Sequence, residues 1–182
     1  LRDCEFCNLT EMVVRADDTR ESLMRKARLA TILGTWQSTL TDFRYLSSSW
    51  KKNCEDERLL GVSMTGIMDC ELTNGKESGL ETLLYDLRQE VVEVNRKFAK
   101  NIGVEQSVAT TKPSGTVSQL VDAASGIHAR HNPYYIRTVR ADNKDPLCSF
   151  MKDKGFPYEP CVMKPDNVTV FSFPIKAPEN SV

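Results

Sequence analysis

The sequence lacks an excess of charge, a dense set of cysteines and any long hydrophobic run. Lysine and arginine number 24 against 25 aspartates and glutamates, which gives the 182 residues a net charge of −1. A strongly basic protein binds nucleic acid or an anionic membrane through its overall field, and this balance offers neither partner such a surface. Uninterrupted apolar runs are only a few residues long, so we expect no segment that spans a bilayer.

Cysteine is too sparse for a disulfide scaffold. Six cysteines are spread over 182 residues, and the polar start LRDCEFC has no charged-then-apolar leader of the kind that directs secretion. We therefore expect free thiols in a reducing, cytoplasmic compartment. The chain starts without methionine and ends at APENSV without a helix stop, which we interpret as a fragment of a larger protein.

What the sequence does contain is an alternation of strand-like and helix-like segments. Short apolar or period-2 runs predict strands at 8–14, 58–67, about 106–111, 134–140 and 167–175. Apolar residues at 3–4 spacing predict helices over about 25 residues after Asp18, about 78–99, about 116–124 and 146–155. Helices between strands at these intervals indicate an α/β domain with parallel strands.

The two long helices carry boundary and packing signals. Asp18 followed by Glu21 is typical of a capping box. The first helix then has an apolar stripe that we expect to face the core, formed by Leu29, Ile32, Leu33, Trp36, Leu40 and Phe43. The second helix ends in Asn-Ile-Gly, which puts Gly103 at the usual place of a C-cap glycine. Between the helices, the polar residues 47–57 (SSSWKKNCEDE) are expected to form a loop.

The stretch ATTKPSGTVSQL (109–120) predicts a phosphate site at a strand–turn–helix junction. The first N–H groups of a helix lack partners and its dipole makes that end electropositive, so anions bind there. Glycine would let ligand oxygens approach the backbone, proline would fix the entry dihedral, and the hydroxyls would add donors. The predicted phosphate-binding residues are Pro113, Ser114, Gly115, Thr116, Val117 and Ser118. P-S-G-T is not the Walker signature of phosphate-binding loops. The same residues could therefore instead form a simple Ser or Thr N-cap of a helix.

A second reading of the residue types is a zinc site. Cys4 and Cys7 form C-x-x-C, while His128 and His131 form H-x-x-H, and the four together could bind tetrahedral zinc. The chain would then be a zinc-stabilised or purely structural α/β module. The long separation between the two pairs neither supports nor excludes this arrangement.

Four ordered motifs resemble the large, catalytic chain of ribonucleotide reductases, most of all the adenosylcobalamin-dependent class. The phosphate-loop motif is TTKPSGTVSQLVDAASGIH (110–128). The other three are CEFCNLTEMVV (4–14), NCEDERLLGVSMTGIMDC (53–70) and the pair NPYYIRTVRADNKDPL (132–147) with VTVFSFPIKAPE (168–179). The likeness covers nearly the whole chain, and the middle and end motifs look closer to the monomeric, triphosphate-using branch.

The resemblance implies a fold and a place within it. The expected architecture is the ten-stranded α/β barrel that these enzymes share with glycyl-radical enzymes. Residues 1–182 would belong to its second half, with the loop of the radical-bearing cysteine upstream of Leu1 and the C-terminal tail also outside the chain. A nucleotide effector would bind upstream as well.

The resemblance also implies a chemistry. A thiyl radical, generated with adenosylcobalamin, would take the 3′-hydrogen of a ribonucleotide, and a cysteine pair would reduce the 2′-carbon to give the deoxyribonucleotide. Cys7 matches one cysteine of that pair, and thioredoxin or a similar dithiol would reduce the resulting disulfide. Cys4 matches no role, no metal ligand is implied, and the isolated chain would be inactive.

Overall fold

The computed structural model describes residues 1–108, 114–179 and 181, and within them the chain forms two compact units. Leu1–Arg130 makes up the first unit and His131–Glu179 the second. Among the described residues, no helix has both the length and the hydrophobicity that crossing a bilayer requires.

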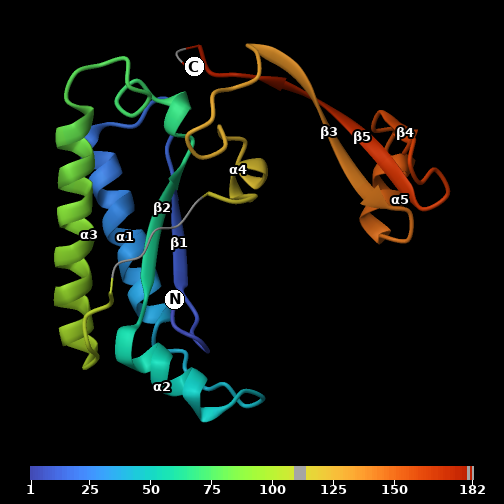
Figure 1. Cartoon of the computed structure of the whole chain (residues 1–182). Coiled ribbons are helices and arrows are strands. Elements are labelled where there is room, and N and C mark those ends of the chain that lie inside the picture. Colours follow the sequence, from blue (N-terminus) through green and yellow to red (C-terminus); the bar gives the residue numbers. More distant parts are fainter. Residues whose placement is uncertain (109–113, 180, 182) are drawn as a thin grey trace. The chain divides into compact units, whose positions relative to one another are not determined.

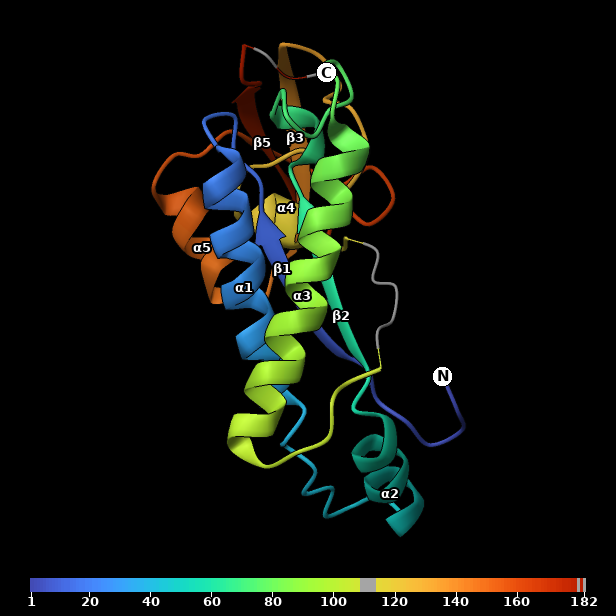
Figure 2. The same cartoon turned by 90° about the vertical axis from the view of Figure 1, so that its left-hand side faces the viewer.

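The first unit is a pair of parallel strands covered on one face by two long helices (Figure 1). The strands are β1 (Asn8–Val13) and β2 (Leu60–Thr65), paired from Asn8↔Leu60 to Val13↔Thr65. The helices are α1 (Arg20–Gln37), α2 (Ser48–Glu57), α3 (Leu80–Ile102) and the single turn α4 (Val117–Leu120), with a 3-10 turn, η1 (Ile67–Asp69), after β2. Figure 2 shows α1 and α3 side by side in front of the strands. The predicted α/β class and the first two strands are confirmed.

The second unit is an antiparallel sheet, which the sequence analysis did not predict. Its elements are β3 (Tyr134–Asp142), α5 (Pro146–Asp153), β4 (Tyr158–Pro160) and β5 (Val168–Lys176), in the sheet order β3-β5-β4. The expected strands form, but β5 runs antiparallel to β3, from Tyr134↔Lys176 to Asp142↔Val168. A parallel pair needs a connection that travels back along the whole strand. The connection from β3 to β5 contains the eight-residue α5, which spans only about 12 Å, and the three-residue β4, while nine-residue β3 spans about 30 Å. Neither element runs back along the whole of β3, in keeping with the antiparallel pairing.

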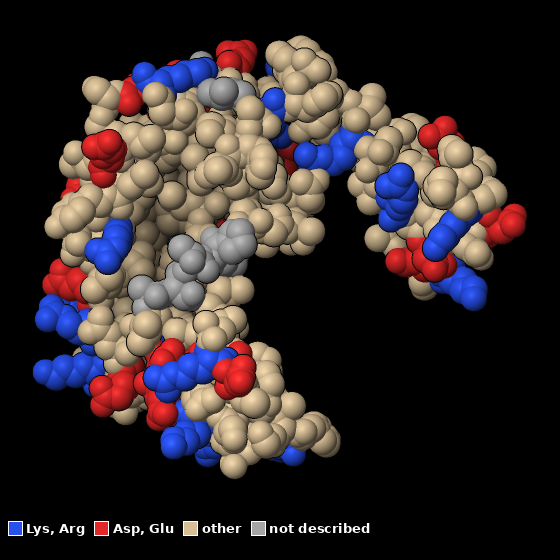
Figure 3. Space-filling model, viewed as in Figure 1, with Lys and Arg blue, Asp and Glu red and all other residues tan. Residues whose placement is uncertain are grey.

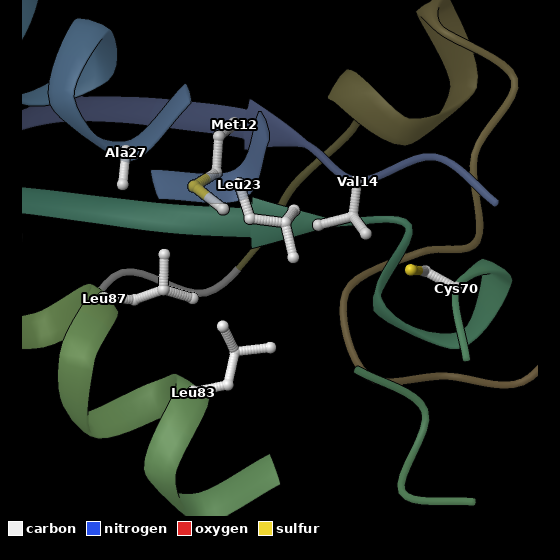
Figure 4. Close-up of a cluster of buried hydrophobic side chains, with 7 residues drawn as sticks. All are labelled: Met12, Val14, Leu23, Ala27, Cys70, Leu83 and Leu87. Atoms are coloured by element: carbon white, nitrogen blue, oxygen red, sulfur yellow. The ribbon is translucent and has the colours of Figure 1, made fainter. Parts of the chain in front are cut away.

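The core of the first unit lies between the strands and the helices. Figure 4 shows side chains from β1, α1 and α3 converging there, with Val14 and Cys70 from the segments that follow the strands. The cluster consists of Met12, Val14, Leu23, Ala27, Cys70, Leu83 and Leu87. It fixes the helices on one face of β1 and leaves the other face available for a site.

The face of α1 that packs on the strands is not the predicted one. Its buried residues are Leu23, Ala27, Ala30, Thr31, Gly34 and Thr35, whereas Leu29, Leu33, Trp36 and Leu40 of the predicted stripe are exposed. The helix lies so close to the strands that a Cβ on Gly34 would come within 2.3 Å of the Leu60 side chain. Only small residues fit there, and the Thr31 and Thr35 hydroxyls donate to the carbonyls four residues earlier, at 2.7 and 2.8 Å. Satisfied hydroxyls can be buried at little cost.

Several predicted boundaries also differ from the structure. The N-cap of α1 is Thr19, which forms a capping box with Ser22, and the helix has 18 residues instead of about 25. The expected loop at 47–57 is the helix α2, because Cys54 is buried while its polar residues face solvent. The helix predicted at about 116–124 is only the four-residue α4. The glycine cap of α3 at Gly103 is confirmed, with φ of 74°.

The strand predicted at about 106–111 falls partly outside the described residues. Residues 106–108 are not assigned as a strand, but they run beside the start of β2: Leu60 N–H donates to the carbonyl of Val108 at 3.0 Å. The buried Asn95 of α3 holds this segment, because its side chain accepts from Ser107 N–H at 3.0 Å and donates to the Thr35 hydroxyl at 2.8 Å.

The reassigned face of α1 leads to a stability prediction. In the 182-residue chain, Leu23→Ala should lower the free energy of unfolding by about 2–5 kcal/mol, since it removes a fully buried side chain. Leu33→Ala is the matched control in the same helix, at a residue that is 60% exposed, and should leave stability nearly unchanged. Urea unfolding followed by circular dichroism measures both. A larger loss from Leu33→Ala would restore the originally predicted face.

The start of α1 predicts a pH dependence. Burial alone would raise the pKa of Asp18, but hydrogen bonds from Lys26, Ser22 and the Arg15 amide outweigh it and lower the pKa below 3.8. The ionised carboxylate therefore stabilises the folded state above about pH 4, and this contribution is lost as the pH falls through the lowered pKa. Unfolding midpoints measured between pH 6 and pH 2 should fall less steeply for Asp18→Asn than for the wild type. Parallel curves would contradict the assignment.

Candidate functional site

The face of the strands opposite the helices carries a glutamate between two serines. Because side chains alternate along a strand and Met12 faces the helices, Glu11 points to the opposite side, where its partner in the register is Ser63. The Ser63 hydroxyl donates to one carboxylate oxygen of Glu11 at 3.0 Å. The second oxygen accepts from the Ser114 hydroxyl, also at 3.0 Å. Glu11 thus joins β1, β2 and the predicted phosphate loop.

A threonine at the end of β2 completes this contact. The Ser114 hydroxyl lies 3.1 Å from the hydroxyl of the fully buried Thr65. Thr65 in turn donates to the carbonyl of Ala124 at 3.1 Å and accepts from Gly126 N–H at 3.4 Å. The described end of the loop and the segment that returns from α4 are therefore fastened at the same point of the sheet.

The predicted phosphate-binding residues lie in different environments. Pro113 lies outside the described residues. Gly115, Thr116 and Val117 are exposed, and a Cβ on Gly115 would meet no atom of the described residues within 4 Å, so the backbone there is open to a ligand. Ser118 is fully buried, and its hydroxyl accepts from the Gln119 side chain at 3.3 Å.

The short length of α4 changes the physical argument for this loop. A single turn has little dipole, so the electropositive helix end that the sequence analysis invoked is not present. The alternative of a simple N-cap finds no support either, because Thr116 makes no side-chain capping bond. What the loop offers an anion is its exposed backbone N–H groups and the Thr116 hydroxyl.

A buried ion pair, which the sequence analysis missed, holds the segment that follows the loop. Arg130 makes two bonds of 2.8 Å to the carboxylate of Asp69 in η1, and both side chains are only 4% exposed. Asp69 also accepts from Ala124 N–H at 2.8 Å, and Arg130 reaches the carbonyl of Asp122 at 3.2 Å. The partners are 61 residues apart, so no local sequence pattern signals the pair.

Cys7 directly precedes β1. It lines a pocket of about 260 Å³ together with residues at the end of α1 and in α2, among them Ser38 and Cys54. Its sulfur lies 3.8 Å from the carbonyl of Asn8. Within the described residues, neither Cys7 nor Cys4 forms a disulfide. The pocket makes Cys7 a partly accessible thiol, in contrast to the buried thiols of Cys54, Cys70, Cys148 and Cys161.

The zinc arrangement does not form in the part of the chain that the structure describes, where no three His, Cys, Asp or Glu side chains come together in a way that could hold a metal. His128 is exposed, with its Nδ1 atom 2.9 Å from the carbonyl of Ser125 in its own turn. His131 belongs to the second unit and packs against the ring of Tyr135.

Charge does not collect on the visible face of the first unit. Figure 3 shows lysine and arginine side chains interspersed with aspartate and glutamate rather than separated by sign. In the second unit, the backbone amides of Met163 and Lys164 together with Arg140 lower the pKa of the Cys161 thiol. Cys161 belongs to the second unit, and we give it no role in the site of the first unit.

Comparison with known proteins supports the resemblance seen in the motifs. No family profile matches the chain. The adenosylcobalamin-dependent ribonucleoside-triphosphate reductase of Lactobacillus gasseri is 31% identical over 153 residues, which are 70% of this chain and 20% of that protein. The enzyme of the same name from Euglena gracilis is 28% identical over 182 residues, covering 97% of this chain and 24% of its own length.

A solved structure agrees with these relatives. The crystal structure of a B12-dependent, class II ribonucleotide reductase matches the chain with a TM-score of 0.76 and 25% identity, covering 100% of this chain and 29% of that one. The chain thus spans only a fifth to a quarter of the curated relatives that it matches.

The fold and the comparisons therefore define an α/β protein of the ribonucleotide reductase type. More narrowly, the chain is homologous to part of the catalytic chain of the adenosylcobalamin-dependent, class II ribonucleotide reductases. The family resemblance inferred from the motifs is confirmed. The ten-stranded barrel and the individual site residues stay predictions.

The buried ion pair yields a prediction of its own. Arg130→Ala should destabilise the 182-residue chain by about 3–5 kcal/mol, because it leaves the Asp69 carboxylate buried without its charge partner. Arg44→Ala, which removes an exposed arginine paired with exposed Asp42, should leave the urea midpoint unchanged. Equal midpoints for the two variants would show that the Asp69–Arg130 pair does not hold the fold.

Proposed function

We propose that this chain is a part of the catalytic barrel of an enzyme that reduces ribonucleoside triphosphates to 2′-deoxyribonucleotides. One observation carries the proposal: Ser114 of the phosphate-loop motif is hydrogen-bonded to Glu11, on the strand that starts directly after Cys7. The loop and the redox cysteine that the resemblance names are thus linked by one extended segment.

The spacing along that segment suits a nucleotide. Glu11 lies four positions after Cys7, which at about 3.3 Å per residue amounts to roughly 13 Å of extended chain. This is comparable with the length of a ribose that carries an extended triphosphate. We infer that the phosphates bind at the loop while the sugar lies toward Cys7.

The loop has the groups that an anion needs. The first backbone hydrogen bond within α4 is donated by Gln119 to the carbonyl of Thr116, so the N–H groups of residues 116–118 precede it and are not used in that turn. With no Cβ on Gly115 and open space around it, phosphate oxygens can approach these amides closely. Backbone amides and the Thr116 hydroxyl are the proposed phosphate donors.

Cys7 would supply reducing equivalents. In the implied reaction, a thiyl radical takes the 3′-hydrogen, the 2′-hydroxyl leaves as water, and two cysteines give up two electrons and form a disulfide. Cys7 is one of the two, and its partner lies on another part of the enzyme. Thioredoxin or a similar dithiol then reduces the disulfide, which requires that Cys7 be reachable, and the pocket of about 260 Å³ at its side is in keeping with that need.

The remaining parts of the enzyme fall outside this chain. Adenosylcobalamin supplies the radical in this class, but the pocket at Cys7 is too small for a corrinoid, and we assign no residue of the chain to it. The radical-bearing cysteine, the effector site and the rest of the ten-stranded barrel would likewise come from elsewhere in the enzyme. The proposed setting is a reducing, cytoplasmic one.

The role of Cys7 is tested in the full-length enzyme that contains this chain. Cys7→Ser should abolish multiple turnover with thioredoxin, because no disulfide can form, while nucleotide binding is retained. Cys4→Ser is the matched control in the same motif and should turn over normally. The measurement is deoxyribonucleotide formed per enzyme over many cycles, and normal turnover of Cys7→Ser would remove Cys7 from the mechanism.

A further inference from the structure

The carboxylate of Glu11 stands where a negative charge would normally be unfavourable. It lies next to Ser114, at the edge of a loop that is proposed to bind phosphates, and simple electrostatics would make it repel them. Its two oxygens, however, each accept a hydroxyl from a different segment, Ser63 of β2 and Ser114 of the loop. The negative charge of Glu11 is thus stabilised by hydrogen bonds from the protein itself.

The hydroxyl protons of Ser114 and Thr65 can each be assigned to an acceptor. Ser114 has a single hydroxyl proton, and among the described residues its acceptors in range are the Glu11 carboxylate at 3.0 Å and the Thr65 hydroxyl at 3.1 Å. A carboxylate is the stronger acceptor, so the proton goes to Glu11, and the Thr65 proton goes to the carbonyl of Ala124. The Ser114 hydroxyl is then not free to donate to a phosphate.

The loop is also confined from its other side. Gly126 has φ of 55°, and a Cβ at this position would come within 3.3 Å of the Ser114 side chain. Gly126 N–H donates to the Thr65 hydroxyl. Ser114 is therefore held between Glu11, Thr65 and the backbone of Gly126, which fixes where the following residues, Gly115 to Ser118, begin.

We propose that Glu11 is a positioning residue of the phosphate loop: it holds Ser114 so that the backbone amides that follow are aimed at the nucleotide's phosphates. The inference rests on the proposed function and refines it, because it makes Ser114 a link to Glu11 instead of a direct phosphate donor. Glu11 itself touches neither the phosphates nor the reacting carbon.

The sign of the effect separates this role from simple electrostatics. In the full-length enzyme, Glu11→Ala should raise the KM for the ribonucleoside triphosphate about tenfold with little change in kcat, because the loop loses the charge-assisted hydrogen bond between Ser114 and Glu11. Inorganic tripolyphosphate, used as a competitive inhibitor, should weaken by a similar factor. If Glu11 only repelled the phosphates, both ligands would bind more tightly to the variant.

Further variants keep the test decisive. Ser114→Ala should raise KM as Glu11→Ala does, and the double variant should be no worse than either single one, because both remove the same contact. Glu11→Gln, which keeps an acceptor for Ser114, should recover part of the affinity. Glu81→Ala makes the same change of net charge at an exposed residue of α3, and should behave as the wild type.

The possible results test the proposed reductase activity and the positioning role of Glu11 separately. A wild-type enzyme that forms no deoxyribonucleotide would overturn the proposed function and this inference with it. An active wild type combined with an unchanged or lowered KM for Glu11→Ala and Ser114→Ala would overturn the inference alone. Strictly additive effects of Glu11→Ala and Ser114→Ala on KM would also contradict the positioning role of Glu11.

Discussion

The parallel register of β1 and β2 is the constraint on which the rest of the first unit depends. Pairing Met12 with Met64 and Glu11 with Ser63 decides which side chains face the helices and which face away. A slip of one residue would turn Glu11 into the core and Met12 out of it. The hydrophobic cluster under α1 and α3 opposes such a slip, so the packing on one face maintains the polar arrangement on the other.

The polar face depends on few but well-satisfied contacts. The carboxylate of Glu11 and the buried pair of Asp69 with Arg130 both act across long stretches of sequence, and each fastens a different end of the segment from Ser114 to residue 130. The two contacts differ in burial: Asp69 and Arg130 are buried, and Glu11 is half-buried. A buried ion pair adds little net stability, but removing one partner is costly. Both contacts are suited to defining where a loop lies, which is what a binding site requires.

Local sequence was a good guide to some elements and a poor one to others. The strand β2 and the glycine end of α3 follow from nearby residues, and motifs spread along the chain pointed to the right family. The face of α1 could not be chosen, because two stripes share the same helical spacing and Thr31 and Thr35 count as polar until their hydroxyls are seen to be satisfied. The contact of Ser114 with Glu11 joins residues 103 positions apart, beyond any local pattern.

Gly34 limits how α1 can move. Its missing side chain is the notch into which Leu60 fits, with Thr10 beside it, and the next position along the helix carries the larger Thr35. Shifting α1 along its axis by one residue, or rotating it by one residue, would place a larger side chain against the strand. Steric overlap with Leu60 therefore holds α1 in one position on the sheet. Any rearrangement of this part of the protein would have to carry the helix and both strands together, as one rigid body.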